Sequence, residues 1–379
     1  MKQGWEYKKV GSICDIFTGK LDANAANENG LYPFFTCSKT PLSINTYAYD
    51  FECVLIAGNG DLNVKYYNGK FNAYQRTYIL KLQKNIFDVD MRYIYDFFSL
   101  YIEELRRKSI GGIIKYIKLG DLTDALLPLP PLSTQLTIVS ELDKINELIR
   151  LKKEQLKDYD NLSQSIFYEM FGDPVENEKG WEVKKLGEIS SLICNGNTPK
   201  GGSEVYVKEG FLFLRSQNVW KNRIDLEDVA YIDESTHLSL KKSILKHNDL
   251  LITKTGRINT ENSSLGRTAL FEGGDGSANI NGHVYLVRLK ENMVHKYILY
   301  ILISNSYREL IRKTCVGGID KRQLNKDHIE DFPIIFPPIE LQKIYSNRVS
   351  IIERQKSAVQ QSITDLETLL ASRMQYWFE

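Results

Sequence analysis

Residues 4–13 read GWEYKKVGSI, and residues 180–189 read GWEVKKLGEI. A second matching pair reads LPPLSTQ at residues 129–135 and FPPIELQ at residues 336–342. The first pair is 176 positions apart (4 to 180), and the second is 207 apart (129 to 336). Because a long-period repeat fixes the architecture of a chain, the sequence predicts two copies of one unit. We call these repeated segments the frame. The residues between them do not repeat, which indicates two modules that recognise different things in the same way.

The composition is that of an ordinary globular protein. A length of 379 residues suits two or three domains, with 42% hydrophobic and 26% charged residues. The formal net charge of +1 does not indicate nucleic acid, so a DNA ligand would need basic residues gathered on one face. The five cysteines are scattered without a CxxC pair, which favours reduced thiols. No signal-peptide core and no long apolar run is present, so we expect a soluble cytoplasmic protein.

Two long helices are predicted directly after the two Pro-Pro pairs, at residues 132–172 and 339–379. Each has apolar residues at alternating spacings of three and four over more than four heptads, which is typical of a coiled coil. The alternative is that each helix is amphipathic and lies on its own globular part. A helix of about 40 residues is roughly 60 Å long, whereas a domain of about 160 residues is only about 40 Å across. The second helix therefore has to begin near the end of the first, and the pair is predicted to be antiparallel.

The two globular parts, residues 1–131 and 173–338, are predicted to be α+β. Short runs rich in β-forming residues lie between Gly, Asn and Asp turns, at residues 53–57, 78–82, 211–214, 250–253 and 284–287. A helical stretch comes late in each of them, at residues 91–107 and 296–313, and a glycine pair follows it. We expect a curved sheet with a helix at its edge in both.

Motifs for catalysis are not found in the sequence. Both Gly-Lys pairs, at Gly19 and Gly69, lack the Ser or Thr that completes a phosphate-binding loop. The Glu-x-Lys pairs that begin at Glu6 and Glu182 have nuclease-like spacing, but they lie in the repeated frame and are interpreted as solvated strand charges. The histidines show no metal-ligand spacing. We therefore expect no catalytic residue and no metal site in this chain.

Together, the two repeated motifs and the sequence IFYEMFGDP at residues 166–174 resemble the specificity subunit of type I restriction-modification systems. The resemblance covers essentially the whole chain. It implies two similar target recognition domains joined by two long helices that form an antiparallel coiled coil. Such a subunit has no catalysis of its own. It reads a two-part DNA sequence and places methylation subunits on it, together with restriction subunits in the full assembly. Recognition domains vary freely, so the resemblance transfers no base-reading residue.

The candidate DNA-binding residues come from polar stretches that mix cations, amides and aromatics, as base and phosphate recognition requires. The alternative is that these stretches are plain hairpin turns. In the first domain the candidates are Lys65, Tyr67, Asn68, Lys70, Asn72, Tyr74, Gln75 and Arg76. In the second domain they are Arg215, Gln217, Asn218, Lys254, Thr255, Arg257, Asn259, Arg267, Asn279, Asn281 and His283.

The expected partners are double-stranded DNA, two methylation subunits and, where they exist, restriction subunits; no membrane is involved. Tyr159, Ile166, Met170 and Trp377 lie near the ends of the helix seams and are predicted to contact a partner. No cofactor is expected in this chain, whereas S-adenosylmethionine, ATP and Mg would be used by the partner subunits. Two other functions stay open: the specificity half of a methyltransferase-nuclease that cuts beside its site, and a coiled-coil adaptor that binds no DNA.

Overall fold

The computed structural model describes residues 4–260 and 262–379. The chain forms two compact units. Unit 1 is made of residues 1–155 and 359–379, and unit 2 is made of residues 156–358. Both long helices contribute to both units, so each unit contains one globular domain and one end of each helix. No helix among the described residues is long and apolar enough to cross a membrane.

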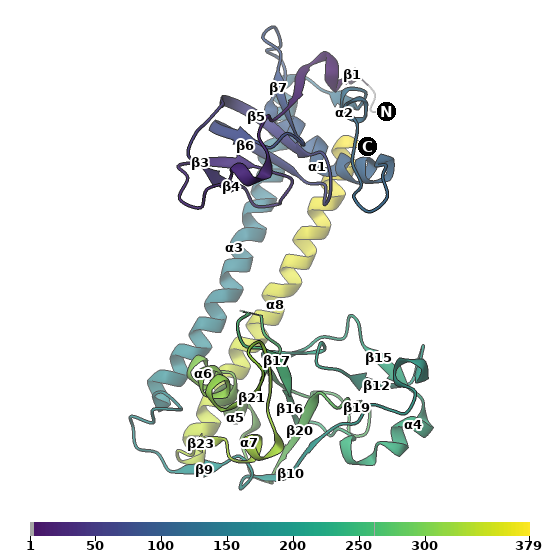
Figure 1. Cartoon of the computed structure of the whole chain (residues 1–379). Coiled ribbons are helices and arrows are strands. Elements are labelled where there is room, and N and C mark those ends of the chain that lie inside the picture. The colour runs from purple at the N-terminus through teal and green to yellow at the C-terminus, as the bar shows by residue number, and fades with distance from the viewer. Residues whose placement is uncertain (1–3, 261) are drawn as a thin grey trace. The chain divides into compact units, whose positions relative to one another are not determined.

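Unit 1 is built on a six-stranded sheet in the order β2-β7-β5-β6-β3-β4, in which only β3 and β6 run parallel. Side chains alternate between its faces, so Val54 and Ile56 pack with the helix α1 and Cys53 and Leu55 pack on the other face. The strands are β2 (Cys14–Thr18), β3 (Tyr32–Phe35), β4 (Leu42–Ile44), β5 (Tyr49–Ala57), β6 (Val64–Ala73) and β7 (Thr77–Leu82), and α1 is Met91–Lys108. Figure 1 shows α1 against this sheet.

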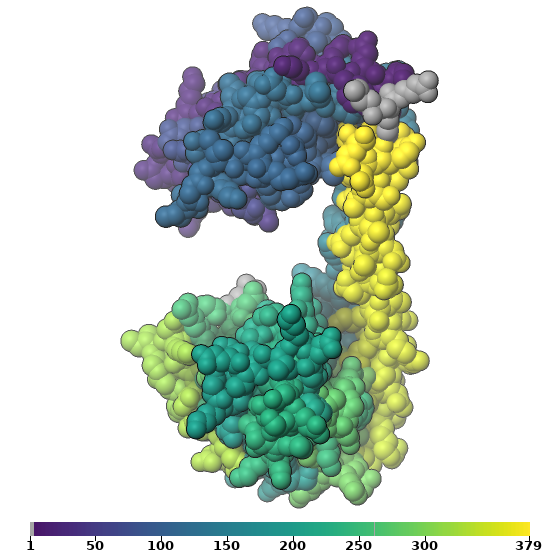
Figure 2. Space-filling view, turned by 90° about the vertical axis from the view of Figure 1, so that its right-hand side faces the viewer, coloured from purple at the N-terminus to yellow at the C-terminus, as the bar shows by residue number. Residues whose placement is uncertain are grey.

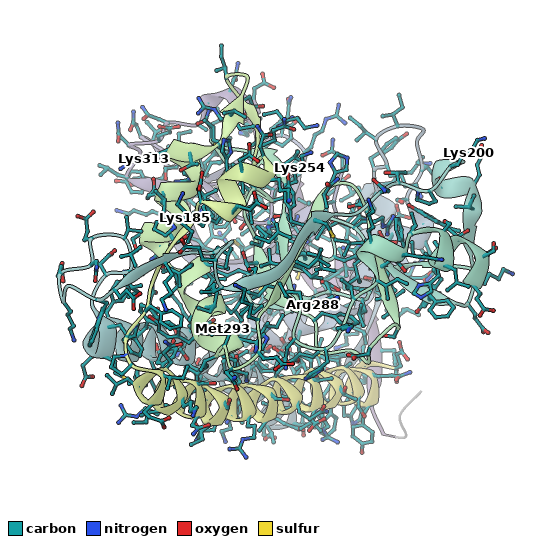
Figure 3. All side chains as sticks on the ribbon, turned by 90° about the horizontal axis from the view of Figure 1, so that it is seen from below. Lys185, Lys200, Lys254, Arg288, Met293 and Lys313 are labelled. Atoms are coloured by element: carbon teal, nitrogen blue, oxygen red, sulfur yellow. The ribbon has the colours of Figure 1, made fainter. Side chains whose placement is uncertain are left out.

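Unit 2 contains two four-stranded sheets, in the orders β10-β20-β16-β18 and β11-β15-β12-β19. Their strands are β10 (Ser190–Asn195), β11 (Tyr206–Val207), β12 (Phe211–Leu214), β15 (Ala230–Ile232), β16 (Leu250–Thr253), β18 (Thr268–Leu270), β19 (Ala278–Ile280) and β20 (Val284–Leu289). Arg288, which is labelled in Figure 3, forms an ion pair of 2.6 Å with the buried Asp249. Because the Asp249 carboxylate is buried, the pair holds β20 against the turn before β16.

Shorter elements complete both units. They are β13 (Val219–Trp220), β14 (Arg223–Ile224), β17 (Thr255–Arg257), β21 (Val316–Gly317), β22 (Lys321–Gln323), α2 (Leu119–Thr123), α4 (Glu234–Ser239) and α7 (Lys326–Glu330). Four 3-10 turns lie at Val10–Ser12, Ala23–Ala25, Gly202–Val205 and Lys241–Ser243. The helix predicted over residues 296–313 is two helices, α5 (His295–Leu302) and α6 (Asn305–Thr314). The prediction of one helix was wrong because the Ser304 hydroxyl accepts a bond from the Tyr307 amide and starts a new helix.

The repeated sequence frame is a repeated structure. Each GWE segment forms a strand that pairs antiparallel with the strand just before its Pro-Pro turn. In unit 1, β1 (Glu6–Lys9) pairs with β8 (Leu126–Leu129); in unit 2, β9 (Val183–Lys185) pairs with β23 (Pro333–Ile335). This two-stranded ribbon ties the beginning of each globular domain to the beginning of a long helix.

The long helices are α3 (Leu132–Phe171) and α8 (Ile339–Phe378), and they run antiparallel to each other within each unit. In unit 1, Glu141 contacts Arg373 and Lys153 contacts Glu367. Residue numbers therefore rise along α3 as they fall along α8. In unit 2 the same order joins Asp160 to Lys356 and, further along α3, Ser163 to Tyr345. The predicted fold class of two similar α+β domains joined by an antiparallel coiled coil is confirmed.

The predicted seam is buried over most of its apolar positions. These are Ile138, Leu142, Ile145 and Ile149 on α3, and Val349, Ile352, Val359 and Ile363 on α8. The heptad pattern missed the buried aromatics Phe167, Phe171 and Tyr345, which pack with Tyr297 from α5. In unit 1, Phe378 packs on Tyr93 and Phe97 of α1. Each helix end therefore also belongs to a domain core.

A buried glutamine follows each Pro-Pro turn. The Gln135 amide donates to the carbonyls of Asp88 (3.0 Å) and Pro130 (2.8 Å), and its oxygen accepts from the Asp90 amide (3.0 Å). Gln342 donates to the Pro337 carbonyl at 2.8 Å, and its oxygen has no hydrogen-bond partner among the residues that the structure describes. Gln135 thus links the helix to the loop before α1, whereas Gln342 holds only its own turn.

Gln135→Ala should therefore destabilise the protein more than Gln342→Ala. The first change removes the partner of the Asp90 amide and of the Asp88 carbonyl, both in partly buried bonds outside the turn, at a cost of about 1 kcal/mol for each lost bond. The second change removes one bond within the turn. Urea unfolding, followed by circular dichroism, measures both, with the exposed Gln360→Ala on α8 as the control. Equal losses of stability for the two buried glutamines would contradict this account of the turn.

Candidate nucleic-acid interface

The first candidate stretch is a strand and not a loop. Residues 64–73 form β6, between β5 and β3, and Leu55 stands opposite Lys65. Residues 65–71 do not form the hairpin turn considered as the alternative, because the pairing with β5 continues through Asn68 and Gly69. Tyr67 joins the aromatic cluster around Phe71 on one face of the sheet, while Asn68 and Lys70 are exposed. Lys65 is half-buried beside Asn63, and burial lowers the pKa of its amine.

Gln75 and Arg76 lie in the turn after β6 and are exposed. Both line a hollow of about 540 Å³ together with Gly58, Tyr78, Tyr116 and Lys118. The Gln75 amide is held by the Asp22 carboxylate at 2.6 Å, and Tyr74 beside it is partly buried. The stretch that follows the glycine pair at 111–112 supplies Tyr116 and Lys118. Sequence reasoning missed these two residues, although the glycine pair marked the place.

Three candidate asparagines are buried and hold backbone in place. Asn72 is 5% exposed, Asn218 2% and Asn279 0%. Asn218 accepts from the Arg215 amide at 2.9 Å and donates to the carbonyls of Asp225 and Asp228. Asn279 donates to Leu240 and Ser243, and Asn72 to Thr46. Their side chains are already bonded inside the domain, so the structure argues against a DNA contact by these three.

In unit 2 the candidates Gln217, Arg257 and Arg267 line one hollow of about 360 Å³ together with Trp220. The Arg267 guanidinium lies 3.8 Å from the centroid of the Trp220 ring, and the indole donates to the Gln217 carbonyl at 2.9 Å. Arg257 is 68% exposed and pairs with Asp320 at 3.2 Å. Trp220 was not among the predicted candidates, because one tryptophan in a sequence gives no sign of where its face points.

The hollow in unit 2 is a cationic site. Burial and the nearby charge of Arg308 lower the pKa of Arg267. An arginine nevertheless stays charged, because its pKa begins above about 12. Its side chain is further fixed by bonds to the carbonyls of Ser263 and Asn262. An aromatic face under a fixed guanidinium, next to an exposed arginine and an amide, can stack on a base or hold a phosphate.

The remaining candidates of unit 2 do not line this hollow. The Lys254 amide donates to the His283 carbonyl at 2.8 Å, and the Asn281 side chain caps His283, so these three meet at one turn. Thr255 stands opposite Gln323 on the neighbouring strand, and Asn259 is exposed. Arg215 is tied to Asp228 and lies 5.9 Å from the Tyr206 ring centroid.

The predicted partner-binding residues are engaged inside the protein. Trp377 stacks on Trp5 with centroids 6.2 Å apart and donates to Glu141 at 3.1 Å. Ile166 and Met170 pack against the core of unit 2, and Tyr159 is partly buried. Other apolar residues of the two helices face solvent: Leu136, Leu148, Leu151, Leu162, Ile344, Ile351, Leu369 and Tyr376. The uncovered side of α8 is visible in Figure 2.

The described residues contain no group of three or more His, Cys, Asp or Glu side chains placed to hold a metal ion. The two Glu-x-Lys pairs form ion pairs on the surface, Glu6 with Lys8 at 3.1 Å and Glu182 with Lys184 at 3.6 Å.

Comparison with known proteins identifies the class. The family described as "Type I restriction modification DNA specificity domain" matches residues 2–158 and 178–368, and this chain belongs to that family. The chain is 39% identical over 153 residues to the Escherichia coli type I restriction enzyme EcoDI specificity subunit. That match covers 40% of this chain and only 34% of the relative. The MjaVIII specificity subunit of Methanocaldococcus jannaschii is 22% identical over 377 residues, which is 93% of this chain and 86% of that protein.

Solved structures share the fold over the whole length. The S subunit of the M. genitalium type I restriction-modification system has a TM-score of 0.59 at 14% identity, and covers 100% of this chain and 98% of its own. A chain from a study of complex assembly and conformational transition in the type I R-M system has a TM-score of 0.57 at 18% identity, covering 99% and 97%.

Substitutions of two adjacent residues, Asn218 and Gln217, should have different effects on the stability of the protein. Asn218→Ala removes three hydrogen bonds from a buried loop and should cost about 1–3 kcal/mol of stability. Gln217→Ala alters an exposed side chain and should change stability by less than about 0.5 kcal/mol. Thermal unfolding of the two variants checks this. If Asn218→Ala melts like the unchanged protein, the buried amide does not hold the loop.

Proposed function

We propose that this chain is the DNA-reading subunit of a type I restriction-modification assembly and that it recognises a two-part DNA sequence. The observation that carries the proposal is a repeated frame with two different polar surfaces. Both domains tie their first strand to a long helix in the same way, whereas Gln75 and Arg76 in one and Gln217, Arg257 and Arg267 in the other stand in unlike surroundings.

The side chains of these surfaces suit the two tasks of a DNA reader. Arginine and glutamine match the donor and acceptor patterns of guanine and adenine in the major groove. Lysines such as Lys70 and Lys118 are exposed and suit phosphate, which positions a protein without reading sequence. The net charge of +1 is no obstacle, since it is the local gathering of cations that attracts the duplex.

The chemistry would come from other subunits. Two methylation subunits, and restriction subunits in the full assembly, would bring S-adenosylmethionine, ATP and Mg to the DNA. The apolar residues on the outer faces of α3 and α8 support a docking role for the helices, because Leu148, Leu151 and Ile351 are about half exposed on otherwise polar faces. Trp377 and Met170 make contacts inside the units, so they hold the helix ends in place and contribute to docking only indirectly.

An expressed complex tests the proposal. The chain, produced together with a methylation subunit of its family, should methylate a two-part sequence that single-molecule sequencing of the genome detects. Arg257→Ala should relax one position in one half of that sequence, at a cost of about 1–3 kcal/mol if the arginine makes a bidentate base contact. Lys290→Ala, on an exposed site after β20, serves as the control and should leave the sequence unchanged.

Complex formation without any sequence-specific methylation or salt-sensitive binding to duplex DNA would contradict the proposal and would favour an adaptor between proteins. Methylation by the purified chain alone would show that it is an enzyme.

A further inference from the structure

A second repeated element lies just before the ribbon of each domain. Residues 105–115 read LRRKSIGGIIK, and residues 311–321 read IRKTCVGGIDK. Both have two cations at the second and third positions, Gly-Gly-Ile at the seventh to ninth, and Lys at the eleventh. The first segment begins in the last turn of α1 and the second in α6. Both copies keep the same apolar residue at the same place, although the candidate reading residues of the two domains differ.

Both segments fold as a tight hairpin. Ile110 bridges Tyr116 in unit 1, and Val316 pairs with Gln323 in unit 2. The first glycine of each pair has a left-handed backbone, with φ of 119° at Gly111 and 138° at Gly317. A Cβ there would come within 2.5 Å of the Ile114 carbonyl and 2.8 Å of the Lys321 carbonyl. Only glycine fits this backbone conformation, so both domains require glycine at the same place in the turn, two residues before the isoleucine.

The isoleucine at each tip stands in solvent. Ile113 is 105% exposed and Ile319 is 90% exposed, the two highest values among the large hydrophobic residues that are exposed in the described ranges. A single exposed apolar side chain needs no explanation. The same side chain exposed at the same position of two domains, on a turn that requires glycine, indicates a binding role.

The surroundings of the tips are cationic. Lys115 and Lys321 are exposed, and among the described residues neither has an ion-pair partner. Arg322 braces the second turn by donating to the Gly318 carbonyl at 3.3 Å. Asp320 is the one acidic residue of the two tips, and Arg257 neutralises it at 3.2 Å. An exposed isoleucine with a lysine two residues further along suits a ligand that has an apolar interior and negative charge around it. Duplex DNA is such a ligand, because its stacked bases lie between two phosphate strands.

Each hairpin adjoins the candidate interface of its own domain. In unit 1 the Gly60 amide donates to the Lys115 carbonyl at 3.0 Å, and Tyr116 and Lys118 line the hollow with Gln75 and Arg76. In unit 2 the returning strand β22 pairs with β17, so that Lys321 stands opposite Arg257. A duplex held by those residues would lie next to the tips.

We propose that Ile113 and Ile319 act as wedges that enter the duplex beside the two half-sites, where each unstacks a single base step, while Lys115 and Lys321 hold the adjacent phosphates. The inference rests on the proposed DNA-reading function. Apolar side chains of this size, inserted between base pairs, unstack a step and kink the duplex. Such a wedge contributes affinity and favours steps that unstack easily, so it adds selectivity at a position without a base-edge hydrogen bond.

The test uses the full chain in complex with its methylation subunit and a duplex that carries the methylated sequence. 2-Aminopurine is placed in turn at positions in and beside each half-site, excluding the adenine that becomes methylated. Its fluorescence rises when a base loses its stacking. The unchanged complex should give one bright position beside each half-site. Ile319→Ala should abolish only the signal next to the half read by the second domain, and Ile113→Ala only the other. Each should weaken binding by about tenfold, or about 1.4 kcal/mol.

Leu31→Ala is the matched control, because Leu31 is 83% exposed in unit 1 and lies outside the hairpin. It should leave the signals and the affinity unchanged. If the unchanged complex does not bind duplex DNA, the proposed function fails. If the complex binds and both isoleucine variants keep signal and affinity, the wedge is wrong while the DNA-reading function stands. If the variants lose the methylation subunit during purification, the tips bind protein, and the proposal is overturned.

Discussion

The antiparallel ribbon between the first strand of each domain and the strand before its Pro-Pro turn is the constraint on which the rest of the structure depends. β1 with β8 and β9 with β23 bring the start of each domain to the start of a long helix. Trp5 and Trp377 then stack at one helix end, and Trp181 donates to the Phe171 carbonyl at another. Because Trp5 and Trp181 belong to the repeated frame, the ribbon sets the direction in which each helix leaves its domain.

The same frame explains how the recognition surfaces can differ without loss of the fold. The cores under the surfaces are built from β5, β7 and α1 in unit 1 and from β16, β20 and α5 in unit 2. The exposed candidates Gln75, Arg76, Gln217 and Arg257 lie in turns and short strands outside those cores, such as β17 and the turn after β6. A change of sequence there alters bonding groups at the surface and removes little buried apolar area, so its cost in stability is small.

The sequence predicted the repeat, the strands and the helix starts well, because Pro-Pro turns and heptad spacing act locally. The alternating spacing of three and four also predicted an apolar seam on the long helices, where Ile138 and Val349 are buried. The site was predicted less well. Asn218 and Asn279 are of a residue type that often contacts DNA bases. Their side chains instead donate hydrogen bonds to backbone carbonyls, up to 39 positions away in the sequence. Trp220 and Lys118 reach the interface through folding alone, since their partners come from elsewhere in the chain: Arg267 from the turn before β18, and Gln75 and Arg76 from the turn after β6. Local composition does not distinguish an amide that supports a loop from one that the loop presents.

The central claim is that two independent readers share one frame. Replacing residues 173–338 by the same region of a relative, and mapping methylation across the genome in the expressed complex, tests it most directly. The account predicts that one half of the methylated sequence changes and the other half stays the same. A continuous target, or an exchange that rewrites both halves together, would contradict it.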